Sequence, residues 1–286
     1  MFNLAAYFDR IGYSGSKEPS AETLCALHRA HMLAVPFENL DIHLRRPIVC
    51  DEAAFLRKII DERRGGFCYE LNGAFAALLR ALGFDVTLLS ARVTRADGSD
   101  SVEFDHLALR VDLPGRCAAE SRADNRPGAA QFAPKFPADS WLADVGFGDS
   151  FIEPLRLIAG LDHPQIGRVY CFREMEGGFA MGFSSDGKAA SGDKTGGHEW
   201  RKQYSFTLQP HELAEFAPMC RYHQTSPESH FTQQRVCSRA TPLGRITLSD
   251  LKLIETRQGQ REERELQDEH EWQAALNVLF GIKLPA

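Results

Sequence analysis

The sequence has little that would mark a disulfide-stabilised or metal-binding protein. Its seven cysteines lie at scattered positions along 286 residues and never form a Cys-x-x-Cys pair. An odd number of scattered cysteines in a chain of this length argues against a disulfide framework and against a zinc site. The N-terminal segment also lacks the basic stretch and the long apolar core of a signal peptide. We therefore expect a reduced, cytoplasmic protein without a metal.

Long apolar runs and an excess of positive charge are absent as well. No stretch approaches the roughly 18 apolar residues that a membrane-spanning helix needs, so we expect no membrane partner. The formal net charge of −6 gives no global positive field for nucleic acid. The chain also holds no P-loop and no internal repeat. What is present, 43% hydrophobic and 25% charged residues, is typical of a globular protein with a real core.

The most informative stretch runs from Arg63 to Asn72 and reads Arg-Arg-Gly-Gly-Phe-Cys-Tyr-Glu-Leu-Asn. Apolar side chains recur every three or four positions from Leu71 onward, which predicts a helix that begins at or just after Cys68 and ends near Gly83. The unpaired N–H groups and the dipole at a helix start favour a thiolate. We expect this position to lower the thiol pKa from ~8.5 into the range ~3.5–7.5. Cys68 is therefore the candidate nucleophile, with a buried structural cysteine as the alternative.

The hydrophobic period divides the rest of the chain into a helical part and a strand-rich part. Before residue 84 we predict helices at residues 4–11, 20–31 and 51–62, followed by the helix from Cys68. The period then changes to two. It predicts strands at residues 85–93, 104–112, 141–146, 169–173, 179–183, 203–208, 231–239 and 244–253.

The remaining segments are predicted as loops or short helices. Residues 114–139 are rich in Ala, Pro, Gly and Arg and have no apolar period, which indicates a surface loop. Residues 184–197 are polar and Gly-rich, and we expect a loop there too. Residues 211–216 are predicted as a helical turn and residues 268–280 as an amphipathic terminal helix, with the charged stretch 262–271 as its solvated face and approach.

A histidine and an aspartate on two of the predicted strands complete a catalytic pattern. Leu107, Leu109 and Val111 share one face of their strand, which places His106 on the opposite face. Asp144 lies on the next strand, so both side chains could project toward Cys68. The histidine would exchange a proton with the thiol, and the carboxylate would orient and stabilise the charged imidazole.

That pattern predicts acyl transfer but does not select one reaction. It is also compatible with a protease, a transglutaminase or an amidase. A cysteine hydrolase and a binding module with a structural Cys68 are both alternatives. If Asp144 only serves a turn, Asp112 or Asp149 would be the carboxylate to consider instead.

Four sequence blocks resemble the signature blocks of the arylamine N-acetyltransferases. They are Val-Pro-Phe-Glu-Asn-Leu at 35–40, Arg-Gly-Gly-Phe-Cys-Tyr-Glu-Leu-Asn at 64–72, Asp-Val-Gly-Phe-Gly at 144–148 and Thr-Ser-Pro-Glu-Ser-His-Phe at 225–231. The blocks occur in family order and span most of the chain. One departure is the longer link between His106 and Asp144, which contains residues 114–139. A surface insertion at a strand connection costs little loop-closure entropy. The longer link therefore does not argue against a triad of Cys68, His106 and Asp144.

The resemblance implies a fold and an activity. The fold would be α+β, with a cysteine-protease-like core made of an N-terminal helical bundle (1–84), a β-barrel-like domain (85–205) and a C-terminal α/β lid (206–286). Acetyl-CoA would be the donor, and arylamines, arylhydrazines or N-arylhydroxylamines the acceptors, in a ping-pong reaction through an acetyl-cysteine. Cys68, His106 and Asp144 would form the triad. The acceptor pocket would be lined by Phe37, Phe147 and Phe231.

Overall fold

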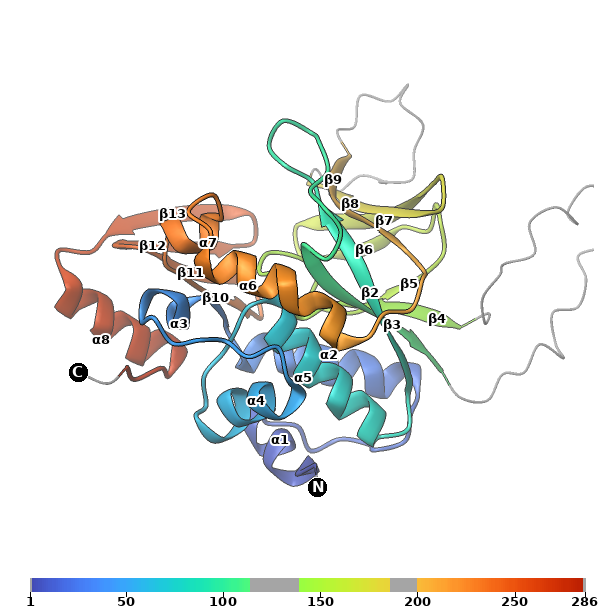
Figure 1. Cartoon of the computed structure of the whole chain (residues 1–286), viewed down its shortest axis with the longest axis horizontal. Coiled ribbons are helices and arrows are strands. Elements are labelled where there is room, and N and C mark those ends of the chain that lie inside the picture. The colour runs from blue at the N-terminus through green and yellow to red at the C-terminus, as the bar shows by residue number, and fades with distance from the viewer. Residues whose placement is uncertain (1, 114–138, 186–199, 285–286) are drawn as a thin grey trace, which may run out of the picture.

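The computed structural model describes residues 2–113, 139–185 and 200–284, and it confirms the α+β class. Figure 1 shows three regions: a group of N-terminal helices in blue and cyan, a curled sheet in green and yellow, and a second sheet with a long helix in orange and red. No helix of the described part is long and apolar enough to cross a membrane.

The N-terminal region is helical because its apolar positions follow a helical period and its helices are capped. The side chains of Ser20 and Asp51 accept hydrogen bonds from backbone N–H groups in the first turn of their helices. The predicted helix at 51–62 is a short α-helix that continues as one π-helical turn. The helical elements are α1 (Leu4–Ile11), α2 (Ala21–Ala34), α3 (Leu40–His43), α4 (Glu52–Leu56), the π-helical η1 (Arg57–Asp61) and α5 (Cys68–Ala81).

Helix α5 lies at the centre of the molecule and is buried on nearly every side. It contacts α1, α4 and the first two strands of the curled sheet. Small residues allow this close packing: a Cβ at Gly73 would lie 2.7 Å from the ring of Phe55 on α4. The helix that starts with the candidate nucleophile is therefore held rigidly from several directions.

The curled sheet is antiparallel throughout and has the order β5-β4-β3-β2-β9-β8-β7-β6. An isolated bridge between Ala159, just after β5, and Phe172 on β7 brings the two ends of the sheet near each other and makes it barrel-like. Leu107, Leu109 and Val111 pack toward α5, as their alternation predicts. The strands are β2 (Asp85–Val93), β3 (His106–Asp112), β4 (Ser140–Ala143), β5 (Leu155–Arg156), β6 (His163–Gln165), β7 (Arg168–Met175), β8 (Gly178–Ser184) and β9 (Arg201–Thr207).

The second sheet has the order β1-β10-β11-β12-β13, and one face carries the terminal helix α8 (Glu269–Phe280) through Trp272, Leu276 and Phe280. Its edge strand β1 (Phe37–Glu38) comes from the N-terminal region. The other strands are β10 (Val236–Thr241), β11 (Gly244–Ser249), β12 (Lys252–Arg257) and β13 (Gln260–Glu265), and the connection to the first sheet holds η4 (Leu213–Phe216), α6 (Ala217–Thr225) and α7 (His230–Gln233).

Three predictions near the C-terminus are wrong. The single strand predicted at 244–253 is β11 followed by a turn at 250–251, after which β12 begins. The predicted strand at 231–239 begins with the short helix α7, which Ser229 caps through its side chain, and becomes a strand only at Val236. The charged stretch that begins at residue 262 is partly the exposed edge strand β13 rather than the approach to α8, because pairing with β12 satisfies its backbone on one side. The predicted loops lie outside the described residues, except Asp139 and residues 184–185.

Candidate active site

The turn before Cys68 is held against strand β1. A Cβ at Gly65 would lie 1.9 Å from the carbonyl oxygen of Pro36, so only glycine allows this approach. The N–H of Glu38 donates to the carbonyl of Gly66 at 2.8 Å. Cys68 follows as the first residue of α5, as the sequence predicts. The position of the thiol is therefore set by backbone contacts between this turn and residues 36–38.

His106 and Asp144 come together from neighbouring strands. His106 is the first residue of β3, and Asp144 follows directly after β4. The imidazole Nε2 donates to the Asp144 Oδ2 at 2.8 Å. The other ring nitrogen, Nδ1, is then available to Cys68, whose sulfur is hydrogen-bonded to the His106 side chain. Cys68, His106 and Asp144 expose 3%, 3% and 0% of their surface, so the three groups interact largely without solvent screening.

The Asp144 carboxylate is held by further donors that sequence reasoning missed. Its Oδ1 accepts from Asn72 Nδ2 at 2.9 Å and from the N–H of Gly146 at 3.0 Å. Its Oδ2 also accepts from the Tyr204 hydroxyl at 2.9 Å. Four hydrogen bonds, including the one from His106, orient this carboxylate and compensate for its burial.

Asn72 also joins the helix to both strands. Its Nδ2 donates to the carbonyl of Leu107 at 2.6 Å, and its Oδ1 accepts from the N–H of Val145 at 2.9 Å. Asn72 stands four residues after Cys68 and hence on the same helix face, which is a signal that the sequence contains. Tyr204 on β9 has no comparable signal, because only the curl of the sheet brings it to Asp144.

A second buried histidine, His28 on α2, supports the loop that carries Asp144. Its Nε2 accepts from the N–H of Asp144 at 3.1 Å, and its Nδ1 donates to the carbonyl of Ile152 at 2.9 Å. Burial lowers the pKa of His28 to about 4, so the ring is neutral at pH 7 and can accept and donate at the same time. His28 therefore positions the backbone without adding a charge to the site.

Burial and ion pairing set the charges of the triad. Burial alone would lower the pKa of His106, but the Asp144 carboxylate reverses this and raises the pKa to about 10. Burial raises the pKa of the Cys68 thiol, while His106 and the N–H of Leu107 oppose that rise. The expected lowering of the thiol pKa by the helix start is therefore outweighed by desolvation. The thiolate depends on the imidazolium beside it, as one coupled pair.

The alternative carboxylates are engaged elsewhere. Asp112 accepts from Arg110 Nε at 2.9 Å and from the Ser140 hydroxyl. Asp149 accepts from Arg168 through both of its carboxylate oxygens. Asp144 is the carboxylate that contacts His106, in agreement with the order of residues in the sequence.

A cavity of about 840 Å³ lies between the two sheets; Phe37, Phe147 and Phe231 line it, whereas Cys68, His106 and Asp144 do not. The ring of Phe147 meets the ring of His106 edge-on at 5.2 Å, so the wall of the cavity contacts the triad through Phe147. The rings of Phe37 and Phe231 lie 6.0 Å apart. The volume lies in the range of small-molecule sites. Among the described residues, no group of three or more His, Cys, Asp or Glu could hold a metal.

A buried charge cluster lies beneath the turn before Cys68 and was not predicted. Lys58 Nζ contacts Asp41 Oδ2 and Glu70 Oε1, each at 2.8 Å. Arg64 NH2 contacts Glu38 Oε1 at 2.8 Å and Asp41 Oδ1 at 3.1 Å. Three carboxylates and two cations are thus buried together. They join β1, α3, η1 and the first turn of α5.

Comparison with known proteins gives consistent matches over the length of the chain. A family model described as N-acetyltransferase matches residues 20–118 and 135–286. A pineal gland isozyme of arylamine N-acetyltransferase from Gallus gallus is 32% identical over 300 residues, covering 99% of this chain and 94% of that protein. Arylamine N-acetyltransferase 1 from Homo sapiens is 30% identical over 297 residues, covering 99% and 94%.

Solved structures match equally well. The arylamine N-acetyltransferase from Salmonella typhimurium has a TM-score of 0.82 at 29% identity, covering 99% of this chain and 92% of that one. The Mycobacterium marinum arylamine N-acetyltransferase in complex with CoA has a TM-score of 0.82 at 27% identity, covering 98% and 93%. Matches of this extent, which include every element of the site, show that the chain belongs to the arylamine N-acetyltransferase family.

Proposed function

We propose that Cys68 accepts an acetyl group from acetyl-CoA and passes it to the nitrogen of an arylamine or arylhydrazine. As a member of this family the chain is an acetyl-CoA-dependent acetyltransferase. The observation that supports the assignment to these residues is the buried hydrogen-bonded contact between His106 and Asp144, next to a cysteine at a helix start. N-Arylhydroxylamines, acetylated on oxygen, are further candidate acceptors.

The first half-reaction forms the acetyl-enzyme. The Cys68 thiolate attacks the thioester carbonyl, and the backbone N–H of Cys68 is a candidate donor to the developing oxyanion. The C–S bond to CoA breaks, and His106 gives its proton to the departing CoA thiolate. One thioester replaces another, so the acetyl group keeps its transfer potential. Asp144 stabilises the imidazolium before this step and orients the neutral ring after it.

The second half-reaction uses the same groups in reverse. The acceptor nitrogen attacks the acetyl carbonyl of Cys68, and His106 takes a proton from that nitrogen. The C–S bond then breaks and the Cys68–His106 ion pair is restored. An arylamine is uncharged at pH 7 and therefore nucleophilic. The ring faces of Phe37, Phe147 and Phe231 suit a flat aromatic acceptor.

Intact-mass spectrometry tests this proposal directly. Incubation with acetyl-CoA and no acceptor should give one acetyl adduct, located on Cys68, and Cys68→Ala should give none. Addition of an arylamine should remove the adduct and release the acetylated amine. An unmodified protein that still acetylates arylamines would contradict the acetyl-cysteine mechanism.

The same experiment separates a transferase from a hydrolase on the same core. In a hydrolase the adduct would disappear without any amine, since water would take the acetyl group. Acetyl-CoA consumption should therefore depend on the arylamine concentration.

A further inference from the structure

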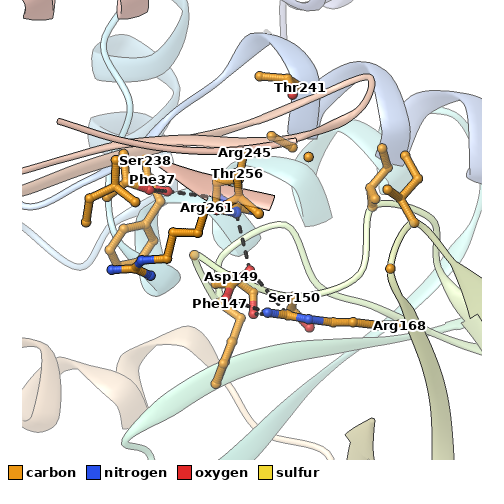
Figure 2. Close-up of a pocket in the computed structure, with 18 of the residues that line it drawn as sticks. Phe37, Phe147, Asp149, Ser150, Arg168, Ser238, Thr241, Arg245, Thr256 and Arg261 are labelled. Atoms are coloured by element: carbon orange, nitrogen blue, oxygen red, sulfur yellow. Dashed lines mark hydrogen bonds and ion pairs between the residues drawn. The ribbon is translucent and has the colours of Figure 1, made fainter. Parts of the chain in front are cut away.

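The cavity has a second wall, which is charged rather than aromatic. Arg168 on β7, Arg245 on β11 and Arg261 on β13 line it, and we call these three residues the arginine cluster. They come from both sheets. Among the described residues that line the cavity, Asp149 is the only carboxylate. In Figure 2, Asp149 stands between Arg168 and Arg245, and dashed lines join it to both.

The carboxylates near the arginine cluster are each shared by two cations. Both carboxylate oxygens of Asp149 accept hydrogen bonds from Arg168, at 3.2 and 2.8 Å. The same carboxylate forms an ion pair with Arg245 Nε at 3.4 Å. Arg261 contacts Glu263 at 2.6 Å, and Lys252 contacts the same carboxylate at 3.3 Å. The three cations of the arginine cluster therefore face two carboxylates, which leaves one positive charge of the cluster without a matching negative one.

Arg245 is the most enclosed member of the arginine cluster, with a side chain only 13% exposed. Its NH1 donates to the Ser238 hydroxyl at 3.0 Å. Burial lowers the pKa of Arg245, Asp149 opposes this and nearby Arg168 adds to it. The contacts of Arg245 compensate only in part for the burial of its charge. A further anion that enters the cavity would therefore stabilise this guanidinium.

We propose that the arginine cluster binds the phosphate groups of the acetyl-CoA donor and so directs its acetyl end toward the aromatic wall and Cys68. This site rests on the proposed function, because that function supplies the donor. CoA carries a diphosphate and a 3′-phosphate, and arginine binds phosphate oxygens through paired N–H donors. Before the donor binds, the Asp149 carboxylate would be the anion that neutralises Arg168 and Arg245 in part. The phosphates would then take over these contacts. An acceptor with a carboxylate is the other possible source of a negative charge, but it would bring one charge, whereas the donor brings several.

Direct binding measurements test the site without relying on turnover. Calorimetric titration of the wild-type chain with CoA, dephospho-CoA and pantetheine compares ligands with three, two and no phosphate groups. Arg245→Gln and Arg261→Gln should each weaken CoA binding by about 10-fold or more, the effect of losing a charged hydrogen bond. The loss should be smaller for dephospho-CoA and smallest for pantetheine. The affinity of the variants should also depend less steeply on salt concentration.

Arg257→Gln is the matched control. Arg257 lies on β12 beside the turn to β13, its side chain is 74% exposed, and it is not among the residues lining the cavity. Its CoA affinity should stay within about twofold of wild type. Arg261 is itself 59% exposed at its side chain, so Arg261→Gln tests the site even if Arg245→Gln does not fold.

Asp149→Asn gives a change of the opposite sign. Removing the internal anion leaves Arg168 and Arg245 free for phosphate, so CoA should bind more tightly, by several-fold. If the arginines only serve to anchor Asp149, this variant should bind CoA no better than wild type, and that result would overturn the proposal.

Two further outcomes would also overturn it. One is unchanged CoA affinity in both Arg245→Gln and Arg261→Gln. The other is unchanged CoA affinity together with a raised KM for 4-aminobenzoate but not for aniline, which would assign the arginine cluster to the acceptor. Neither result affects the proposed function, which stands or falls with the acetyl adduct on Cys68.

Discussion

Cys68, His106 and Asp144 are almost fully withdrawn from solvent, and this withdrawal determines how their charges behave. An isolated buried thiolate would be costly, since burial disfavours the charged form. The imidazolium compensates for that cost, and Asp144 in turn holds the imidazolium. Asn72, Gly146 and Tyr204 then satisfy the remaining capacity of the carboxylate. The reactivity of one sulfur atom therefore depends on a chain of partners.

Asp144→Asn tests this chain of partners. Asparagine can accept from His106 Nε2 but cannot balance the imidazolium, so the pKa of His106 should fall. With less imidazolium beside it, Cys68 should ionise at higher pH than in the wild type, because burial then raises the thiol pKa with less opposition. We expect turnover to drop by at least ~10², given that the equivalent change in a serine protease costs about 10⁴.

Labelling Cys68 with iodoacetamide across a range of pH measures the first effect, and steady-state kinetics measures the second. A variant with the wild-type labelling curve and full turnover would show that Asp144 is only a turn residue.

Glu70 allows a pH-dependent test at the same scale. Its Oε2 accepts from the N–H of Phe67 at 3.1 Å and caps α5, and its Oε1 accepts from Lys58 at 2.8 Å. Burial raises the pKa of Glu70 to about 7 from an ordinary value of 4.5, although Lys58 opposes this. The folded state therefore binds more protons than the unfolded state between these two pH values, so Glu70 makes the free energy of unfolding decrease as pH rises through that window.

Glu70→Gln should remove this decrease while keeping an oxygen for the N–H of Phe67. The free energy of unfolding of the variant should improve relative to wild type as pH rises from about 4.5 to about 7. Urea titrations at several pH values measure the difference. A difference that stays constant across the window would show that Glu70 does not titrate there.

The buried charge cluster works at the scale of elements. Glu38 lies on β1, Asp41 on α3, Lys58 on η1 and Glu70 on α5, and their contacts hold these four elements around the turn that presents Cys68. Arg64, in the turn itself, bonds to Glu38 and Asp41. Because no member is solvated, each depends on its partners remaining in place.

Lys58→Met should therefore be strongly destabilising. Methionine fills a similar volume but leaves Glu70 buried without its cation and Asp41 with Arg64 alone. Breaking a buried pair in this way costs about 3–5 kcal/mol in the free energy of unfolding. Arg57→Met, one residue earlier in η1, is the control, because its side chain is 65% exposed and its pair with Glu62 spans 4.0 Å. It should change stability by no more than about 0.5 kcal/mol. Equal effects of the two substitutions in denaturant titrations would contradict the role of the buried charge cluster.

At the scale of the whole molecule, the site depends on contacts between segments far apart in the chain. Strand β1 pairs with β10, so the N-terminal region supplies the edge of the C-terminal sheet. The side chain of Asn39 donates to the carbonyls of Phe231 and Gln234 and accepts from the N–H of Val236. We propose that the three regions, at 1–84, 85–205 and 206–286, act as domains that these contacts hold around one cavity.

The segment 114–139 gives a prediction at this scale. Its flanking strands already form a hairpin: Asp112 pairs with Ser140, and the N–H of Leu113 donates to the carbonyl of Asp139 at 3.4 Å. The match to the family model also omits residues 119–134. Replacing residues 114–138 with a short Asn-Gly turn should keep the triad in place and leave stability unchanged or raised by about 1–2 kcal/mol, since a shorter loop costs less entropy to close. Thermal unfolding and acetylation of Cys68 measure both effects, and a large fall in either would contradict the assignment as a loop.

Local patterns in the sequence predicted most of the elements and the places of Cys68, His106 and Asp144 on them. The apolar period predicts α5 with Cys68 at its start, and the alternation around Leu107 predicts the face of β3 that carries His106. Both follow from properties of neighbouring residues, which a single sequence contains. The start of α7 and strand β13 escaped the same reasoning, because capping by Ser229 and pairing with β12 decided them.

Only the tertiary structure decided which groups support the triad and where charge gathers. Tyr204 reaches Asp144 because the sheet curls, and His28 reaches it because α2 lies beside the loop that follows β4; neither has a local signal. Arg168 and Arg245 share Asp149 across two sheets in the same way. Desolvation likewise arises only in the folded chain. It raises the pKa of Cys68, which is opposite to the shift expected from its position at a helix start. The local pattern of apolar residues predicts backbone conformation. Burial and long-range contacts depend instead on how distant segments of the chain pack.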